Sequence, residues 1–390
     1  MDRPKMLKPT VLSLSLLTII STGAVAPALG EIGEFFASSD RTLVQLVAVM
    51  HAVALVPSLL LAGRAAERFS AKKAILGGLA LFSISGIAGG FADNIWLLLF
   101  SRLLMGVGLG MVIPFSTSLI SDLYEGEERT RMMGLSSSFN MLGGMFALIL
   151  SGQLAFFSWR LPFLLYASGV PVMVMVAFFL PGKAAGVKDP RPKGGSLPRN
   201  VYFVALGMFL FCVLFFILTP TLALHMKNNA LGDARVAGVA LSFSTIGGFA
   251  SGFALPVTKR VFKRYLVPVM LTAMSAGFIV LSWFPTSMAV FAASLLIGFA
   301  NRSVYPLFFL KATERTTPGE SVKATALLSA MIYVGQFTAP PFQRFVGIVS
   351  GRPETGFLYL FVALVTLATA LAFFARVIFG VKEQPAAGGR

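Results

Sequence analysis

The sequence has few charged residues and almost no cysteine or histidine. Charged residues make up 12% of its 390 residues, while 56% are hydrophobic and the mean hydropathy is +0.82; a typical soluble domain is roughly 25% charged. A single cysteine, Cys212, excludes an intramolecular disulfide. One cysteine, two histidines and no clustered acids give no support to a metal site or to thiol catalysis. The composition therefore predicts a membrane-embedded chain that holds no metal and no cofactor.

The sequence contains many long apolar runs. Runs of about 20 residues, the length that a helix needs to cross a bilayer, recur between short polar breaks. They predict an all-α membrane protein with about twelve transmembrane helices. The predicted spans lie near residues 9–30, 42–64, 74–92, 95–121, 132–153, 161–181, 201–224, 235–257, 266–284, 288–310, 324–347 and 355–379.

The basic residues that give the net charge of +16 are distributed as in a membrane protein and not as in a nucleic-acid-binding protein. With the N-terminus in the cytoplasm, most of the 32 Lys and Arg fall in predicted cytoplasmic segments. This excess on one side predicts a multi-pass protein with both termini in the cytoplasm. The short loops favour a prokaryotic inner membrane. The predicted outer loops hold only Arg41, Arg160, Lys227, Arg235, Arg344 and Arg352.

The second half of the chain repeats the first at a shift of 192 residues. We expect an N-terminal six-helix bundle over residues 1–181, a cytoplasmic linker over 182–200 and a C-terminal six-helix bundle over 201–390. Such duplicated membrane units are more typical of transporters than of enzymes. The shift places Leu103-Leu104-Met105-Gly106 on Leu295-Leu296-Ile297-Gly298, Pro114 on Pro306, Asp122 on Glu314, and Gly143 on Gly335.

The loop after the second span reads Gly63-Arg64-Ala65-Ala66-Glu67-Arg68-Phe69-Ser70-Ala71-Lys72-Lys73. It resembles the loop signature of the major facilitator superfamily, in which a glycine lets two spans approach and an acid followed by bases forms a cytoplasmic latch. The resemblance implies a latch made by Gly63, Glu67, Arg68 and Lys72, with Asp122 as a partner. The alternative is a positive-inside loop with an incidental acid. The second half has no acid at this position, so the latch is expected to be one-sided.

Two partial signatures of the same family follow in the fourth and fifth spans. Arg102 followed by Gly106 is similar to the pattern of proton-coupled members, and Gly134 with Gly143 is similar to that of the antiporter branch. The resemblance implies a drug and proton antiporter. Ordinary close packing of helices is the alternative for these glycines. Gly335 and Pro340 occupy the matching place in the eleventh span, where the proline predicts a bend.

Two arginines inside spans are candidate substrate ligands, because an intramembrane charge is costly and needs a polar cavity or a partner. Arg302, beside Asn301, is expected near the bilayer midplane, and Arg102 about 12 Å further toward the outside. The resembling fold implies that spans 1, 4, 7 and 10 line the cavity, which would expose both. Asn140 and Gln336 complete the predicted substrate contacts. A structural role, paired to backbone carbonyls, is the alternative for either arginine.

Acidic residues are missing from the predicted span centres. A cavity with arginine and without carboxylates should reject organic cations. The candidates for proton coupling are Arg102, His51, Glu31 at the outer mouth of the first span, and Asp122 at the inner end of the fourth. Packing or interfacial roles are the alternative for each. His225, at an outer end, is expected in water.

These features predict a secondary transporter that works by alternating access and exports small amphipathic compounds, neutral, zwitterionic or anionic, by proton coupling, as in multidrug resistance. The alternative is a dedicated carrier of an anionic metabolite. A membrane enzyme would need a nucleophile and base pair, and a receptor an output domain. The expected partners are the bilayer, one small-molecule substrate and protons, with the chain as a monomer.

Overall fold

The described part of the chain consists of helices joined by short connections. The computed structural model describes residues 3–180, 197–314 and 316–379, with no strand in these ranges. Four 3-10 helices occur, η1 Ala26–Ala28, η2 Gly89–Phe91, η3 Leu161–Ser168 and η4 Lys263–Tyr265. The α-helices are α1 Arg3–Gly23, α2 Leu29–Phe35, α3 Arg41–Val49, α4 His51–Phe69, α5 Ala71–Ala88, α6 Ile95–Leu123, α7 Gly126–Phe157, α8 Gly169–Phe179, α9 Arg199–Phe216, α10 Leu218–Asn228, α11 Ala234–Phe262, α12 Leu266–Trp283, α13 Ser287–Thr313, α14 Pro318–Ser350 and α15 Thr355–Phe379.

The predicted all-α fold with about twelve spans is confirmed. Within the described ranges, nine segments are long and apolar enough to cross a membrane, and one of them, Ala234–Trp283, contains both α11 and α12. The apolar part of α1 and the 33-residue α14 complete the set. Several spans consist of two consecutive helices, such as α3 with α4 and α9 with α10. α7 and α14 extend beyond their predicted apolar limits, because their polar first turns continue the helix outside the hydrocarbon.

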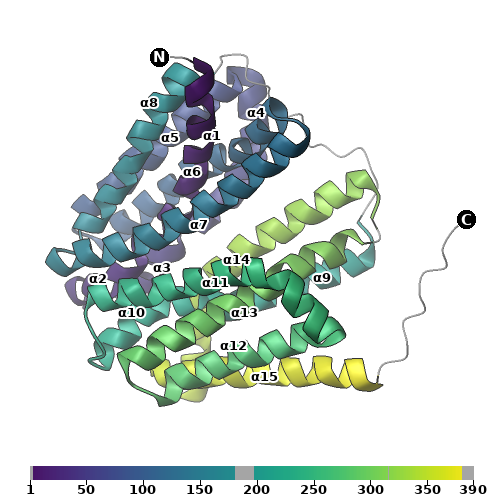
Figure 1. Ribbon diagram of the computed structural model, residues 1–390. Helices are drawn as coiled ribbons and strands as arrows, with labels where there is room; N and C mark the ends of the chain where they lie inside the picture. The colour runs from purple at the N-terminus through teal and green to yellow at the C-terminus, as the bar shows by residue number, and fades with distance from the viewer. Residues whose placement is uncertain (1–2, 181–196, 315, 380–390) are drawn as a thin grey trace, which may run out of the picture.

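The helices form two groups (Figure 1). In the first, α6 packs between α4 and α5, and α1 packs on α7; in the second, α13 packs on α11 and α12, and α9 on α14. The groups meet where α2, α3 and α10 lie, which we call the tight end, and diverge toward the N-terminus and the end of α15, the open end. Of the predicted linker, residues 182–196 lie outside the described residues, and α9 already begins at Arg199.

Equivalent glycines of the sequence repeat make equivalent contacts. A Cβ on Gly106 of α6 would lie 2.1 Å from the carbonyl oxygen of His51 in α4, and one on Gly298 of α13 would lie 1.9 Å from that of Ser244 in α11. Any side chain at either position would force the paired helices apart, because small residues are what allow such close backbone approach in membranes. The repeat in the sequence is therefore also a repeat of helix packing.

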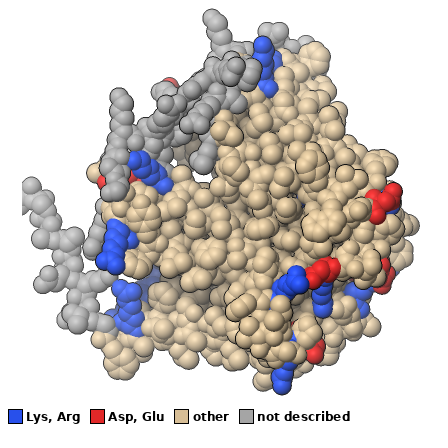
Figure 2. Space-filling model, turned by 180° about the vertical axis from the view of Figure 1, so that it is seen from behind, with Lys and Arg blue, Asp and Glu red and all other residues tan. Residues whose placement is uncertain are grey.

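Charged side chains gather at the two ends of the molecule on the face that Figure 2 shows. The band between them is mostly free of Lys, Arg, Asp and Glu, and acids and bases lie together at the end away from the grey segments. An uncharged band between charged rims fits a protein that spans a bilayer. Large apolar side chains are exposed on the protein, Phe91, Phe157 and Phe253 among them, which suits contact with lipid.

Polar residues at helix starts fix where several spans begin. Asp40 accepts a hydrogen bond from Thr42 N at 2.7 Å, and Asn94 accepts one from Trp96 N at 2.7 Å. Thr317 and Glu320 form a capping box at the start of α14. These side chains satisfy backbone N–H groups that have no partner inside the helix.

Candidate functional site

A cavity of about 360 Å³ lies between the two groups of helices. Its first-group wall comes from α1 and α7, and its second-group wall from α9, α10, α11, α13 and α14. Four of the predicted substrate contacts line it together: Asn140, Asn301, Arg302 and Gln336. The structure therefore brings these residues of three distant helices to one place. Their role in binding stays a prediction.

Arg302 supplies the charge of this cavity. It is exposed on α13, and its guanidinium carbon lies 5.5 Å from the centre of the Tyr305 ring. Gly248 of α11 makes room for its stem, because a Cβ there would lie 2.7 Å from Arg302 Cγ. No acidic residue lines the described walls of the cavity. The site is a cationic group held by aromatic and small residues, without a carboxylate to neutralise it.

Amide groups add hydrogen-bonding capacity on both sides. Asn301 is buried, and its Oδ1 has no hydrogen-bond partner among the described residues. Asn140 donates from Nδ2 to the carbonyl oxygen of Ser15 at 2.8 Å, which ties α7 to α1. Gln336 is buried at the cavity wall on α14. A buried acceptor without a partner is costly, so Asn301 Oδ1 is well suited to receive a donor from a ligand.

Aromatic side chains that the sequence analysis did not single out also line the cavity. Phe215 and Phe216 come from α9, Tyr305 from α13 and Tyr333 from α14. A largely apolar cavity with a few placed polar groups is the usual form of a small-molecule site. In the sequence these residues are not distinguished from the other members of 37 phenylalanines and seven tyrosines, and only the packing of three helices brings them together.

Arg102 lies elsewhere, and the expectation that it is exposed to the substrate cavity is wrong. It is fully buried and does not line the cavity. Its Nε donates to Val47 O at 3.0 Å and its Nη2 to Ser21 O at 2.5 Å, while the Tyr166 ring lies 4.9 Å from the guanidinium. The helix breaks at η1 and between α3 and α4 leave carbonyls that Arg102 satisfies. Arg102 therefore has the structural role that the sequence offered as the alternative, in which its side chain pairs with backbone carbonyls of other helices.

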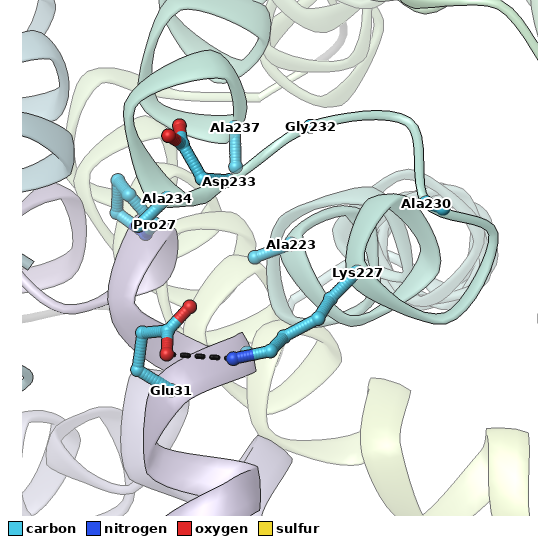
Figure 3. Close-up of a pocket in the computed structure, with 10 residues that line it drawn as sticks. Pro27, Glu31, Ala223, Lys227, Ala230, Gly232, Asp233, Ala234 and Ala237 are labelled. Carbon is cyan, nitrogen blue, oxygen red and sulfur yellow. Dashed lines mark ion pairs between the residues drawn. The ribbon is translucent and has the colours of Figure 1, made fainter. Parts of the chain in front are cut away.

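Of the coupling candidates, Glu31 has the most distinctive contacts. Lys227 of α10 pairs with Glu31 at 2.6 Å and with Glu34 at 2.7 Å, both on α2. Figure 3 shows Glu31 and Lys227 pointing toward each other across the boundary between the two groups, beside Asp233 at the start of α11. His51 is buried in α4 where Gly106 of α6 crosses it. Proton coupling by any of them stays a prediction.

Further polar contacts close the tight end. Arg344 of α14 lies 3.2 Å from Asp40, and Gln343 accepts hydrogen bonds at 2.9 Å from both Gln45 and Thr221. The hydrogen bond from Thr42 and the nearby Arg344 guanidinium hold the pKa of Asp40 below its ordinary value. These contacts join α3 to α10 and α14, so the two groups are locked together at this end.

His225 does not lie in water as expected. It is 4% exposed, and its Nδ1 lies 2.7 Å from Thr355 Oγ1. The sequence placed it correctly at the end of a span, but α10 is covered there by α2, α3 and α15. A position near a helix end does not by itself predict exposure.

The predicted latch is only partly described. Gly63, Glu67 and Arg68 lie in the last turns of α4, and their side chains are outside the described ones. Lys72 donates to the carbonyl oxygens of Ala177 at 2.7 Å and Leu180 at 2.8 Å, at the end of α8. A lysine near the last carbonyls of a helix is stabilising. Asp122 is exposed near the end of α6.

The predicted packing and bending residues have different surroundings. A Cβ on Gly134 would meet nothing within 4 Å, whereas one on Gly143 would lie 2.4 Å from Leu16 Cδ2. Gly335 of α14 faces α9, where a Cβ would lie 2.7 Å from Cys212 Cβ. Pro340 is buried inside α14, and the helix continues through it. Gly143 and Gly335 therefore allow close packing of helices, whereas the space around Gly134 would accommodate a side chain.

Comparison with known proteins gives a family-level match. The model of the Major Facilitator Superfamily matches residues 11–340. "Multidrug resistance protein 2" of Bacillus subtilis (strain 168) is 30% identical over 166 residues, which are 43% of this chain and only 41% of that protein. The "3-(3-hydroxy-phenyl)propionate transporter" of Escherichia coli (strain K12) is 26% identical over 340 residues, 82% of each chain.

Solved structures of the same architecture cover 96% or more of the chain. A bacterial homolog of the human lysosomal transporter Spinster, in an inward-facing and occupied conformation, superposes with a TM-score of 0.78 at 18% identity, over 100% of both chains. A D-xylose-proton symporter superposes with a TM-score of 0.75 at 14% identity, over 96% of this chain and 98% of that chain. At these identities the likeness concerns the fold.

Proposed function

This chain belongs to the Major Facilitator Superfamily, and from that membership we propose that it is a secondary active transporter working by alternating access. Its cargo is a small amphipathic compound, neutral, zwitterionic or anionic, which it exports in exchange for protons. The cavity between the two groups of helices is the substrate site, and the tight end is one of two alternating closures. The relative named as a multidrug resistance protein supports efflux.

The observation that carries this proposal is the position of Arg302 in a cavity without acids. A guanidinium in a low-dielectric site attracts an anionic group and repels a cation more strongly than it would in water. Asn301 Oδ1, buried and without a partner among the described residues, adds an acceptor for a hydroxyl or amide of the substrate. Phe215 and Tyr305 provide faces for an apolar or aromatic part.

A dedicated carrier of an anionic metabolite is the second candidate. The relative from Escherichia coli that matches 82% of the chain is named for an aromatic acid, 3-(3-hydroxy-phenyl)propionate. Such a molecule combines a carboxylate, an aromatic ring and a hydroxyl. Arg302, Tyr305 and Asn301 offer one matching group for each of these parts.

The topology follows from the placement of charge. We propose that the open end, with the N-terminus and the end of α15, faces the cytoplasm of a bacterial cell, as the positive-inside rule predicts. The chain then opens inward and is closed outward by α2, α3 and α10. It acts as a monomer in the inner membrane, with Asp122 and the loop around Lys72 as the cytoplasmic latch.

For coupling, we propose that a proton entering from the outside is taken up by Glu31. Glu31 takes up this proton while the tight end is open and Lys227 is away from it. When the tight end closes, the Lys227 ammonium favours the ionised carboxylate, and the proton leaves through the cavity, which is then open to the cytoplasm. Glu34 also pairs with Lys227 in this closed form. Protonation would thus be linked to a conformational change and not to direct contact with the substrate.

The test is internal pH in proteoliposomes that contain the purified protein, under an imposed proton gradient. Amphiphilic anions and cations of matched size are added to wild type, Arg302→Ala and Arg376→Ala, the last carrying its change at the exposed end of α15. Anions should trigger proton movement in wild type and Arg376→Ala but not in Arg302→Ala. Movement triggered equally by cations, and retained in Arg302→Ala, would contradict the proposal. A response to one aromatic acid alone would favour the dedicated carrier.

A further inference from the structure

Three buried polar atoms at the tight end have no hydrogen-bond partner among the described residues: Arg41 Nη2, His225 Nε2 and Tyr359 Oη. Tyr359 is 0% exposed and His225 is 4% exposed. Arg41 begins α3 in the first group, whereas His225 on α10 and Tyr359 on α15 belong to the second. Buried polar atoms in native proteins are nearly always hydrogen-bonded, and exceptions often mark water or ion sites.

The three side chains share one location. The His225 and Tyr359 rings are 5.0 Å apart between centroids and meet edge to face, at 70°. The Arg41 charge interacts electrostatically with both of these side chains. The three unpartnered atoms thus come from one cluster that bridges the two groups of helices.

All three atoms are hydrogen-bond donors. Asn229 donates from Nδ2 to the His225 carbonyl oxygen at 2.8 Å, which fixes the orientation of its amide, and the same nitrogen lies 3.3 Å from His225 Nδ1. We therefore assign Nδ1 as an acceptor, and in this tautomer its single lone pair receives the Thr355 hydroxyl at 2.7 Å. A neutral imidazole that accepts at Nδ1 carries its proton at Nε2. Arginine can only donate, and the tyrosine hydroxyl is free to do so.

The carboxylates of the first group near this cluster are committed to other partners, and Glu354, next to Thr355 in the second group, is exposed. Asp40 is held by Thr42 N at 2.7 Å and by Arg344 at 3.2 Å. Glu31 and Glu34 both pair with Lys227. None of the ion pairs found in the described ranges involves Arg41, so its charge is not balanced by a carboxylate. Three donors and one positive charge make an environment for an anion, since a water molecule accepts only two hydrogen bonds.

We propose that Arg41, His225 and Tyr359 bind one chloride-sized monovalent anion between the two groups of helices. The close contact of the two rings favours a single-atom anion over an organic acid. Because Arg41 lies on one group and the other two residues on the other, the site exists only while the tight end is closed. A ligand that binds one conformation stabilises it, so the anion holds the tight end shut.

Thermal unfolding of the purified full-length protein tests the site. Melting is recorded with increasing sodium chloride, with sodium gluconate keeping the ionic strength constant. Wild type should show a saturable rise in melting temperature with chloride, and bromide should replace chloride. In Tyr359→Phe, which removes one oxygen and keeps the ring, the chloride concentration for half the rise should increase at least tenfold. The same salts added to wild type without a rise would overturn the proposal.

Two control variants locate the effect. Arg376→Ala removes an exposed arginine at the opposite end of α15 from Tyr359, and Arg302→Ala removes the cationic group of the cavity. Both should keep the chloride response of wild type. Loss of the response in Arg302→Ala together with its retention in Tyr359→Phe would place the anion in the substrate cavity and overturn the assignment. This outcome is distinct from failure of the transport proposal, since melting does not depend on proton movement.

Discussion

Gly152 of α7 and Gly238 of α11 face each other where the two groups of helices touch. A Cβ on Gly152 would lie 2.6 Å from Ala234 O and 3.1 Å from Gly238 Cα, and one on Gly238 would lie 2.6 Å from Leu148 O. The two backbones are therefore in direct contact across the boundary. A side chain at either position would separate the groups near the tight end.

We expect Gly238→Ala to disfavour the conformation closed at the tight end. The added methyl group meets backbone atoms that cannot move alone, and such overpacking costs about 1–3 kcal/mol. Closure is measured by the yield of a cross-link that a short bis-thiol-reactive reagent forms between cysteines introduced as Gln45→Cys and Gln343→Cys, in a Cys212→Ser background. The tips of the native side chains are 2.9 Å apart, so the reagent spans the length that the two glutamines fill. The yield should fall. Gly252→Ala, on the same helix with nothing within 4 Å of its Cβ, should leave it unchanged, and equal effects would refute this explanation.

Loss of the Lys227 charge should also weaken closure. Lys227→Gln removes both ion pairs across the boundary, and because these pairs are partly exposed we expect a cost of about 1 kcal/mol. Glu31→Gln should have a larger effect than Glu34→Gln, since the Glu31 side chain is 29% exposed and that of Glu34 is 67% exposed. The same cross-linking yield measures all three. A larger effect of Glu34→Gln would show that Glu31 is not the main partner.

Arg102→Gln should destabilise the fold. The substitution leaves buried carbonyls of Ser21 and Val47 without their charged donor, and we expect a loss of about 2–5 kcal/mol. Thermal unfolding in detergent reports this as a clear fall in melting temperature. Arg302→Gln is the matched control, because Arg302 is exposed in the cavity, and its melting temperature should stay near that of wild type. A stable Arg102→Gln protein with altered substrate preference would instead support the expectation that Arg102 contacts the substrate.

Asp233 should contribute to stability in a pH-dependent way. Hydrogen bonds from Arg235 lower its pKa below the ordinary 3.8, so its stabilising effect is present above that value and is lost as the pH falls through the lower folded pKa. Asp233→Asn keeps the cap of α11 but removes the charge. The variant should be less stable than wild type by about 0.3–1 kcal/mol at pH 6, and the difference should vanish in strong acid. Melting curves between pH 2 and 7 measure it, and a difference that grows in acid would contradict the assignment.

The sequence predicted the spans well because apolar length is a local property. Each predicted span corresponds to a described helix or to a consecutive pair, and Arg302, Asn301, Asn140 and Gln336 come together in one cavity. The sequence analysis wrongly expected Arg102 in the substrate cavity, because a sequence indicates how deep a residue lies in its span but not which groups its side chain contacts. The groups that Arg102 contacts, Ser21 O and Val47 O, are backbone carbonyl oxygens. Every residue has one, so the sequence does not indicate which of them accept from an arginine.

The contacts of the tight end could not be predicted for a different reason. Glu31 and Lys227 are almost 200 residues apart, and only the way that the two groups of helices lean together makes them neighbours. The same holds for Arg41 and Tyr359. Repeat symmetry does not help here, since these residues break the symmetry between the halves. Pairings across the boundary depend on one conformation of the whole molecule, whereas spans depend on the chain alone.

Arg302 has an electrical consequence. In alternating access the membrane potential falls mainly across whichever closure is shut, so the cavity lies at the potential of the side to which it is open. The empty cavity carries the uncompensated positive charge of Arg302, and a bound monovalent anion cancels it. The loaded form would then change sides without moving net charge in the field, whereas the empty form would move one. A change of 100 mV is worth about 2.3 kcal/mol per charge, so voltage would act on the return of the empty carrier.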